Sequence, residues 1–332
     1  MSGFTIATLG SHSALQILKG AKDEGFSTLL FATKDRTSFY QRFKFIDKVI
    51  KLKEYKEVLK YKTKEKLILI PHGSFVAYLG EAGNKNLHIP YFGNKKVLDW
   101  EGNRRMQIDW IAEAGLNLPR KFRRGDTIDR AVIVKFYGAA GGKGYFITHN
   151  QKDFEKKITP FLKRDFIVQE YVIGVPIYLH FFYSPITKSM ELLSIDRRYE
   201  TNVDSLGRMP LTHQEKIDIV PSFVVVGNSP LALRESLLPE AYEMAEKLVK
   251  ASQRLIDKRG LFGPFCLETI VTPDKKFYVI ELSCRIVAGT NLFIDSSPYA
   301  SLLYDEPMST GRRIAREIKL AVKQKKLNMI LD

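Results

Sequence analysis

The sequence FCLETIVTPDKKFYVIEL, residues 265–282, predicts a β-hairpin that decides the fold. Two apolar, partly β-branched runs, 265–271 and 277–282, flank the turn-forming residues 273–276. This composition is typical of a strand, a turn and a second strand. A four-residue loop at 273–276 would make residues 272 and 277 cross-strand partners. This fixes the register of the whole hairpin, because each step back along the first strand is matched by one step forward along the second.

This register pairs Glu268 with Glu281. Side chains that face each other in this way lie about 5 Å apart at Cβ, and two like charges there are destabilising unless a positive group intervenes. A divalent cation is the natural candidate, since Ser283 and Arg285 continue the same face with groups that suit metal-bound phosphates. The alternative is an exposed hairpin whose acids point into water or meet nearby lysines. Spacing alone does not decide between the two interpretations.

A glycine-rich loop between two further β-type runs, 131–136 and 145–148, favours the metal site. Glycines lack Cβ, so backbone N–H groups in such a loop can approach an anion closely. The spacing and the strand that follows exclude a P-loop and the dinucleotide fingerprint. Lys135 stands at a strand end where it can reach phosphates under the loop, which argues against a hairpin tip without a ligand. The loop residues expected at phosphates are Gly138, Gly141, Gly142, Lys143 and Gly144.

The first hundred residues alternate between strand and helix patterns, which predicts a small parallel sheet. Ligands of such sheets gather at the carboxyl ends of the strands. His12 and Ser13 follow one expected strand, and Ser74 follows another. A helix N-terminus with hydroxyl donors forms a phosphate site, but His12 or Ser13 could equally cap the helix. The expected strands are 4–9, 28–32 and 67–71, and the expected helices are 13–24 and 101–114.

The order of these motifs, followed by the strand and polar segment FIVQEYVIG at 166–174, resembles the ATP-grasp fold. The segments FCLET at 265–269, ELSCRIVAGTN at 281–291, RESLLP at 234–239 and GRRIARE at 311–317 are similar to the archaeal formate-dependent formaminoimidazole carboxamide ribonucleotide synthetases. The resemblance covers essentially the whole chain. It implies an α/β ATP-grasp fold with an N-terminal Rossmann-like, pre-ATP-grasp subdomain. We expect this subdomain at 1–100, the ATP-grasp domain at 101–332 and its flap at roughly 125–175.

The resemblance also implies a reaction. ATP would activate formate as formyl phosphate, and the amine of aminoimidazole carboxamide ribonucleotide would attack it, giving the formamido nucleotide, ADP and phosphate in purine biosynthesis. Metal ions and cationic side chains assist such phosphoryl chemistry by positioning and electrostatic stabilisation. The chain would then be a C–N bond-forming ligase that uses ATP and Mg²⁺, or Mn²⁺ in its place. The resemblance further suggests a homo-oligomer.

Site residues follow from the resemblance position by position. It places Glu268 and Glu281 at the metal, and Lys135 and Arg285 at the reacting phosphates as catalytic residues. Ser283 stands where many relatives carry a metal-binding asparagine, and Pro176 stands where a ribose-binding acid is frequent, so the ribose contact is not assigned. Asn228 would contact the substrate, with a turn residue as its alternative. The remaining expected contacts are Glu170, Tyr171 and Val172 to adenine, largely through the backbone, and His12, Ser13 and Ser74 to the nucleotide substrate.

The composition is typical of a soluble enzyme in the cytoplasm. The chain has 332 residues, 45% of them hydrophobic, without the run of about 20 apolar residues that a membrane span needs. Its N-terminus lacks the pattern of a signal peptide. The two cysteines, Cys266 and Cys284, would point to opposite faces of the hairpin. We therefore expect small buried residues rather than a disulfide or a zinc site.

The net charge of +15 raises the hypothesis of a nucleic-acid partner. The basic residues cluster at 48–66, 120–124 and 319–326, but lysines mixed with glutamates typically mark a solvated helix face. Excess positive charge also attracts anionic substrates. We expect neither nucleic acid nor membrane as a partner. The alternatives are another ATP-grasp carboxylate–amine ligase or an inactive paralogue, and a non-catalytic nucleotide- or RNA-binding protein, which steeply salt-dependent binding without ATP turnover would reveal.

Overall fold

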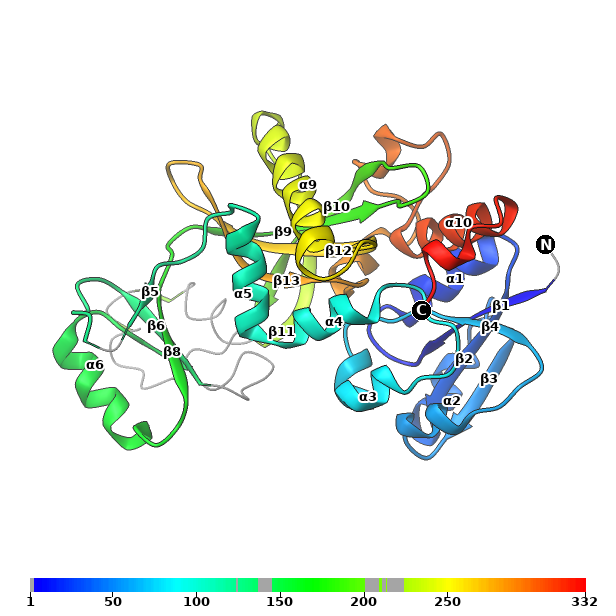
Figure 1. Cartoon of the computed structure of the whole chain (residues 1–332), viewed down its shortest axis with the longest axis horizontal. Helices are drawn as coiled ribbons and strands as arrows, with labels where there is room; N and C mark the ends of the chain where they lie inside the picture. The colour runs from blue at the N-terminus through cyan, green and yellow to red at the C-terminus, as the bar shows by residue number, and fades with distance from the viewer. Residues whose placement is uncertain (1–2, 124, 137–144, 201–208, 211–212, 214–223) are drawn as a thin grey trace.

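Three β-sheets follow one another along the long axis of the computed structural model (Figure 1). A parallel sheet lies at one end, a five-stranded antiparallel sheet lies in the middle, and a four-stranded antiparallel sheet lies at the other end. The predicted α/β class is therefore confirmed. The structure describes residues 3–123, 125–136, 145–200, 209–210, 213 and 224–332.

The N-terminal sheet has the strand order β3-β2-β1-β4, and all its neighbours run parallel, as predicted. The carboxyl ends of β1 and β4 lie side by side, which brings the residues after these strands together. The expectation of a helix face at 48–66 was wrong, because this stretch forms the edge strand β3 and the 3-10 helix η1. Lysines suit an edge strand because they discourage pairing with another chain. The elements are β1 (Phe4–Leu9), α1 (Ala14–Asp23), β2 (Ser27–Thr33), α2 (Lys34–Tyr40), β3 (Lys48–Leu52), η1 (Tyr55–Lys60), β4 (Lys66–Leu69) and α3 (Phe75–Lys85).

The sheet at the opposite end contains the two predicted runs around the glycine-rich loop. They form an antiparallel pair, β6 and β7, that joins β8 and β5 in the order β5-β8-β6-β7. This sheet has a small core of its own, which includes Phe122, Val134 and Phe136. The loop residues 137–144 lie outside the described part of the chain. The elements are β5 (Lys121–Phe122), β6 (Val132–Phe136), β7 (Tyr145–Thr148), α6 (Gln151–Ile158), η2 (Thr159–Phe161) and β8 (Phe166–Glu170).

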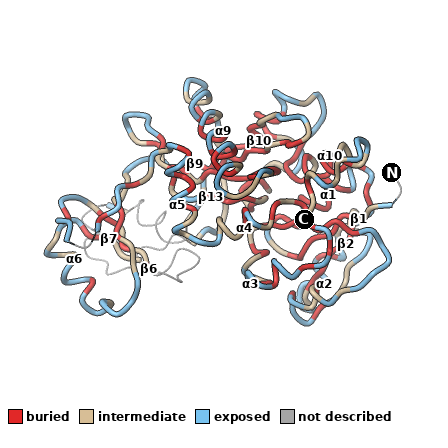
Figure 2. The backbone as a smooth tube through the Cα atoms, in the orientation of Figure 1, coloured by how far each residue is buried: buried red, intermediate tan, exposed pale blue. Residues whose placement is uncertain are grey.

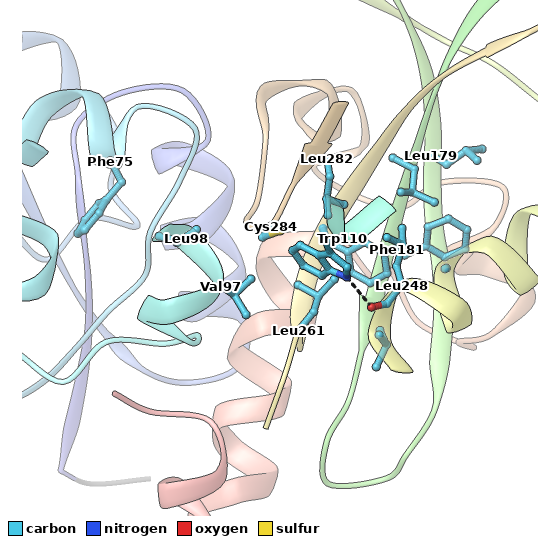
Figure 3. Packing of buried hydrophobic residues seen from close by; sticks show 14 of the residues in the cluster. Phe75, Val97, Leu98, Trp110, Leu179, Phe181, Leu248, Leu261, Leu282 and Cys284 are labelled. Atoms are coloured by element: carbon cyan, nitrogen blue, oxygen red, sulfur yellow. Dashed lines mark hydrogen bonds between the residues drawn. The ribbon is translucent and has the colours of Figure 1, made fainter. Parts of the chain in front are cut away.

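The central sheet has the order β11-β10-β9-β12-β13 and an apolar face. Leu179 and Phe181 of β9 pack in one core with Trp110 of α5 and Leu248 of α9, and the indole N–H of Trp110 donates a hydrogen bond of 3.0 Å to the Leu248 carbonyl (Figure 3). Helices α5 and α9 thus cover one face of the sheet, which leaves the other face for polar residues. The elements are α5 (Arg104–Glu113), β9 (Val175–Tyr183), β10 (Met190–Glu200), β11 (Val225–Pro230), η3 (Glu235–Leu237), α9 (Leu238–Leu255), β12 (Gly263–Val271) and β13 (Phe277–Ser283).

The single helix expected at 101–114 is instead two helices, α4 (Lys95–Gly102) and α5. Asn103 lies between them with extended backbone, and its side chain accepts hydrogen bonds from the N–H groups of Arg105 and Met106. Asparagine is a strong N-cap, so it ends one helix by starting the next. The core spacing within the second helix was correct, because Trp110 and Ile111 are fully buried.

The last helix, α10 (Thr310–Lys323), returns to the N-terminal sheet and packs against α1. Glu24 at the end of α1 accepts hydrogen bonds from Arg312, Arg316 and Lys319 of α10. Buried residues are concentrated in the parallel and central sheets, and the end of the molecule with the sheet β5-β8-β6-β7 is more exposed (Figure 2). Among the described helices, none has the length and apolar composition to span a membrane. Three further 3-10 helices are η4 (Ala288–Phe293), η5 (Ala300–Leu302) and η6 (Leu327–Met329).

Candidate active site

The predicted pairing of Glu268 with Glu281 is confirmed, although the predicted loop is wrong. Val271 pairs with Phe277, so the turn contains five residues rather than four, and Lys275 adopts a φ of 64° in it. A β-bulge between Glu268 and Thr269 then shifts the register by one residue. The longer turn and the bulge offset each other, and the two glutamates still face each other.

The two glutamates belong to a polar row that crosses the central sheet. Asp196 of β10 pairs with Tyr178 of β9, Tyr178 pairs with Glu268 of β12, and Glu268 pairs with Glu281 of β13. Cross-strand partners point to the same face, and alternate residues of a strand point to opposite faces. The row therefore lies on the face that α5 and α9 do not cover. This face is the structural basis of the candidate site.

The positive partner of Glu268 is Arg198, which comes from β10 across the intervening strand β9. Its two terminal nitrogens donate hydrogen bonds of 2.9 and 2.8 Å to the two carboxylate oxygens, and its guanidinium lies 3.7 Å from the centre of the Tyr178 ring. The hydroxyl of Ser283 donates a weaker bond of 3.4 Å to Glu268. An arginine thus compensates Glu268, a partner that the sequence did not indicate. Arg198 is not a free surface charge, because its side chain is only 20% exposed and is paired with Glu268.

Glu281 has an unusually basic carboxylate. Desolvation by the surrounding protein, followed by the negative charge of Glu268, raises its pKa to about 7. The side chain still contacts solvent, so protein crowds it on some sides and leaves it open on another. Lys135 of β6 lies within electrostatic range of Glu281, and desolvation together with the charge of Arg104 lowers the pKa of its ammonium to about 8. The sheet β5-β8-β6-β7 therefore places Lys135 where its charge acts on Glu281.

Arg285 connects the hairpin to the N-terminal sheet. Its guanidinium forms an ion pair of 2.6 Å with Glu101, whose other carboxylate oxygen accepts a bond of 2.7 Å from the Cys284 N–H. Ile286 forms a parallel bridge with His72, three residues after the end of β4. The positive charge of Arg285 acts on both Glu281 and His12, so it couples the hairpin electrostatically to the residues that follow β1.

The predicted substrate residues His12 and Ser74 are in contact. The Ser74 hydroxyl lies 2.6 Å from His12 Nδ1, and the side-chain amide of Asn291 donates a bond of 3.0 Å to the His12 carbonyl. Burial and the charges of Arg285 and Arg36 lower the pKa of His12, which favours the neutral imidazole. Ser13 stands at the N-cap of α1 but makes no capping bond, and its buried hydroxyl has no hydrogen-bond partner among the described residues. The capping alternative is therefore wrong for Ser13.

Asn228 lies in strand β11 rather than in a turn, so the turn alternative is wrong. It faces Arg198 across the strand pair, and its side-chain amide donates a bond of 2.6 Å to the buried carboxylate of Asp196. The buried imidazole of His180 contacts the other oxygen of Asp196. The polar row therefore reaches from the carboxylate pair to the predicted substrate-binding asparagine.

Comparison with known proteins then identifies the family. Two family models match, "Domain of unknown function (DUF1297)" at residues 150–332 and "Protein of unknown function (DUF1246)" at residues 6–122. A 5-formaminoimidazole-4-carboxamide-1-(beta)-D-ribofuranosyl 5'-monophosphate synthetase from Pyrococcus horikoshii is 52% identical over 98% of this chain and 99% of its own. The protein of that name from Saccharolobus solfataricus is 45% identical over 98% and 99%. The chain belongs to this synthetase family.

Solved structures agree with this family. The IMP biosynthesis protein PurP from Thermococcus kodakaraensis is 32% identical to this synthetase, with a TM-score of 0.81 over 98% of this chain and 100% of the other. The ADP complex of an N5-carboxyaminoimidazole ribonucleotide synthetase has a TM-score of 0.65 at 13% identity, over 95% of this chain and 76% of the other, and shows the fold alone. The predicted ATP-grasp fold and the predicted class, an ATP-dependent ligase, are confirmed.

The expected adenine contacts of the synthetase lie at the end of β8. The Glu170 N–H donates to the Arg120 carbonyl at 2.8 Å, and the Tyr171 N–H donates to the Ala131 carbonyl at 2.9 Å. Among the described residues, the Val172 N–H has no backbone partner of this kind. Adenine binding at Glu170, Tyr171 and Val172 stays a prediction. The predicted phosphate-binding residues Gly138, Gly141, Gly142, Lys143 and Gly144 lie outside the described residues.

The synthetase presents a donor set that fits magnesium with a nucleotide. Magnesium typically keeps several waters and binds through one or two carboxylates together with phosphates. Glu268 and Glu281 supply two hard carboxylates on one face, and no larger group of His, Cys, Asp or Glu ligands exists within the described residues. Lys135 and Arg285 add positive charge for phosphate oxygens. The geometry therefore suits a metal that a nucleotide brings with it.

Sequence reasoning missed several residues of this site. Glu101, Arg104, Asp196 and His180 had no assigned role, because their partners are far away along the chain. The only local signals were Asn103 as an N-cap before Arg104 and the polar end of the strand that carries Asp196. Cys266 and Cys284 are buried free thiols, as predicted.

Proposed function

We propose that this synthetase formylates aminoimidazole carboxamide ribonucleotide at the expense of ATP and formate. The observation that carries the proposal is the facing pair Glu268 and Glu281 beside Lys135, in a chain whose relatives bear the formaminoimidazole carboxamide ribonucleotide synthetase name. A formate oxygen would attack the terminal phosphorus of ATP, and ADP would leave. The substrate amine would then attack the formyl carbon, lose a proton and expel phosphate.

The residues of the hairpin would bind the reacting phosphates. Glu268 and Glu281 would hold magnesium, which supplies charge neutralisation for the triphosphate when bound. Lys135 would contact the phosphates as a cation, and Arg285 would stabilise charge that develops on the transferred group. Glu101 holds the Arg285 guanidinium at 2.6 Å and would fix its direction. Adenine would lie at Glu170, Tyr171 and Val172.

The substrate nucleotide would lie between the N-terminal sheet and the central sheet. His12 and Ser74, which contact each other at 2.6 Å, and the unpartnered hydroxyl of Ser13 would bind one end of it. Asn228 would contact the other end. Because a carboxylate only accepts hydrogen bonds, Asp196 holds the amide nitrogen of Asn228 and leaves the carbonyl oxygen to accept from an amino or carboxamide N–H of the substrate.

The decisive experiment measures ADP release with each component omitted in turn. We expect release only when formate, aminoimidazole carboxamide ribonucleotide, ATP and Mg²⁺ are present together. Equal release with another carboxylate or another amine would assign the chain to a different ATP-grasp ligase reaction. We also propose a cytoplasmic homo-oligomer without a nucleic-acid partner. Sedimentation equilibrium tests the assembly, and polynucleotide binding measured against salt concentration tests the partner.

A further inference from the structure

A polar cluster with no role in the reaction so far lies beside His12. It contains Arg36 of α2, Tyr78 of α3 and Ser11, which follows β1. The Arg36 guanidinium donates long hydrogen bonds of 3.3 Å to the Gly10 carbonyl and 3.4 Å to the Tyr78 hydroxyl. The Tyr78 hydroxyl donates a bond of 2.9 Å to Ser11. We call these three residues the Arg36 cluster.

The Arg36 cluster is held in place by aromatic packing. The ring of Tyr78 stacks on that of Tyr55 with centroids 4.3 Å apart and an interplanar angle of 15°. The Tyr55 hydroxyl donates to the Gly10 carbonyl, which also accepts from Arg36. The Tyr78 hydroxyl therefore has a fixed position at the carboxyl edge of the parallel sheet. A site assembled before its ligand arrives loses less entropy on binding.

The charge of Arg36 is poorly compensated. Within the described residues, its carboxylate neighbour is Asp35 at 3.9 Å, and both side chains are exposed. Exposed pairs at this distance contribute little. A guanidinium has five donors, and the two long bonds above leave most of them available. Such a group suits an anion with several oxygens, because its planar fork can bind two oxygens at once.

Further features of the same edge of the sheet favour an anion. Helix α1 begins at Ala14, directly behind His12 and Ser13, and helix N-termini attract negative charge. Ser13 is fully buried, and its hydroxyl has no hydrogen-bond partner among the described residues. The positive charges of Arg36 and Arg285 both act on His12. A ligand at His12 thus has one arginine toward the N-terminal sheet and another toward the hairpin.

We propose that the Arg36 cluster binds the 5′-phosphate of the substrate nucleotide and makes the enzyme select a nucleotide over its nucleoside. The inference rests on the proposed function, because it assumes a ribonucleotide at His12. The phosphate would lie against Arg36, Tyr78 and Ser11, and the ribose would lie near His12 and Ser74. The base would extend toward Arg285 and Asn228. The cluster is then a specificity determinant that takes no part in phosphoryl transfer.

The test compares the ribonucleotide with the same compound lacking the phosphate. Arg36→Met should raise the KM for the ribonucleotide about 30-fold, in line with the loss of charged hydrogen bonds, and leave kcat within about twofold. It should leave kcat/KM for the nucleoside unchanged, because that substrate has no phosphate to lose. Tyr78→Phe should act in the same direction and more weakly. Lys34→Met removes a charge from the same helix and should have no effect on either substrate.

A binding experiment separates this inference from the proposed function. Calorimetry with ribose 5-phosphate needs neither formate nor ATP, so it reports on the Arg36 cluster even if the enzyme uses another amine or carboxylate. The wild type and Lys34→Met should bind ribose 5-phosphate, and Arg36→Met should bind it much more weakly. No binding to the wild type would overturn the inference. Equal losses for nucleotide and nucleoside in Arg36→Met, or equal effects of Arg36→Met and Lys34→Met, would also overturn it.

Discussion

Arg198 and Glu268 form a two-pronged ion pair that passes over strand β9, with bonds of 2.9 and 2.8 Å and with the Tyr178 ring beneath the guanidinium. The pair neutralises one member of the facing glutamates. Among the described residues Glu281 has no such partner, and burial raises its pKa to about 7. The roles of Glu268 and Glu281 can therefore be tested by separate experiments.

Arg198→Met should destabilise the metal-free protein. Breaking a largely buried ion pair from one side leaves an unpaired charge, and we expect a loss of about 3 kcal/mol in the free energy of unfolding. The two glutamates would then share one face without the arginine that neutralises Glu268, so saturating Mg²⁺ should stabilise the variant more than the wild type. Urea unfolding with and without Mg²⁺ measures both effects. Arg197→Met, an exposed neighbour, is the control, and equal responses of the two variants to Mg²⁺ would contradict the prediction.

The raised pKa of Glu281, about 7, predicts pH-dependent metal binding. Only the ionised carboxylate binds a cation, so affinity for Mg²⁺ should fall by about tenfold per unit of pH below this value and level off above it. Glu281→Gln should bind Mg²⁺ weakly and without this slope. Calorimetric titrations on both sides of pH 7 measure the effect. A wild-type affinity that stays constant through this range would show that Glu281 is not a metal ligand.

The raised pKa of Glu281 also affects stability. Affinity for Mg²⁺ should rise with pH, whereas the contribution of Glu281 to stability should fall. In the unfolded chain Glu281 ionises near its ordinary pKa of 4.5, whereas in the folded protein it keeps its proton up to about 7. The folded state therefore binds more protons between these values, and the contribution of Glu281 to stability should decline as pH rises through this window and stay constant above it. The difference in unfolding free energy between wild type and Glu281→Gln, measured against pH, should show this decline. A difference that grows with pH would refute the assignment.

Lys135 should set the upper limit of the pH range for nucleotide binding. Desolvation, followed by repulsion from Arg104, lowers its pKa to about 8, so the ammonium loses its charge above this pH and affinity for ATP should fall. Arg104→Met removes the repulsion and should move this fall in ATP affinity to higher pH. Fluorescence titration with an ATP analogue measures it. Arg105→Met, on the exposed side of the same helix, should leave the pH of this fall unchanged.

Asp196 should act as a positioning residue for Asn228. Its buried carboxylate accepts the amide N–H at 2.6 Å, which fixes the direction of the Asn228 carbonyl. Asp196→Asn can present an N–H to Asn228 and allow its amide to turn over. We expect a KM for the ribonucleotide about tenfold higher, with unchanged kcat and unchanged KM for ATP, since one hydrogen bond is lost. An equal rise in both KM values would indicate general damage to the sheet.

The sequence was sufficient for features that depend on neighbouring residues. Alternating and β-branched runs predicted the hairpin and the strands around the flap, and the parallel sheet followed from alternation of elements. The glutamate pair was predicted correctly from a loop of the wrong length, because the bulge at Glu268 compensated for the extra turn residue. Bulges depend on sheet packing as well as on local composition, so counting residues from the turn cannot place them.

Partners that depend on tertiary structure could not be predicted. Arg198 and Glu268 are 70 positions apart, and no pattern in either segment indicates the other. The same holds for Glu101, whose carboxylate is fixed by Cys284 and Arg285 in a separate element. The sequence identified which residues carry chemistry, and the fold determined which of them meet.

Gly20 of α1 and Gly311 of α10 should be required for the close contact between these helices. A Cβ on Gly20 would lie 2.1 Å from the Arg312 backbone nitrogen, and one on Gly311 would lie 2.3 Å from the Gln16 carbonyl oxygen. Alanine gains about 1 kcal/mol over glycine in a helix interior, but backbone atoms cannot move aside as a flexible side chain can. We therefore expect Gly20→Ala to lower the free energy of unfolding by about 2 kcal/mol despite its better propensity.

Gly102→Ala is the matched control, because the nearest atom to its added Cβ is 3.9 Å away. Thermal unfolding should place Gly102→Ala at or above the wild type and Gly20→Ala well below it, and the reverse order would mean that the helices tolerate separation. Helix α1 begins directly after His12 and Ser13, so a displaced α1 also displaces the proposed substrate contacts. Gly20→Ala should therefore raise the KM for the ribonucleotide more than the KM for ATP, whose proposed contacts lie on the other two sheets.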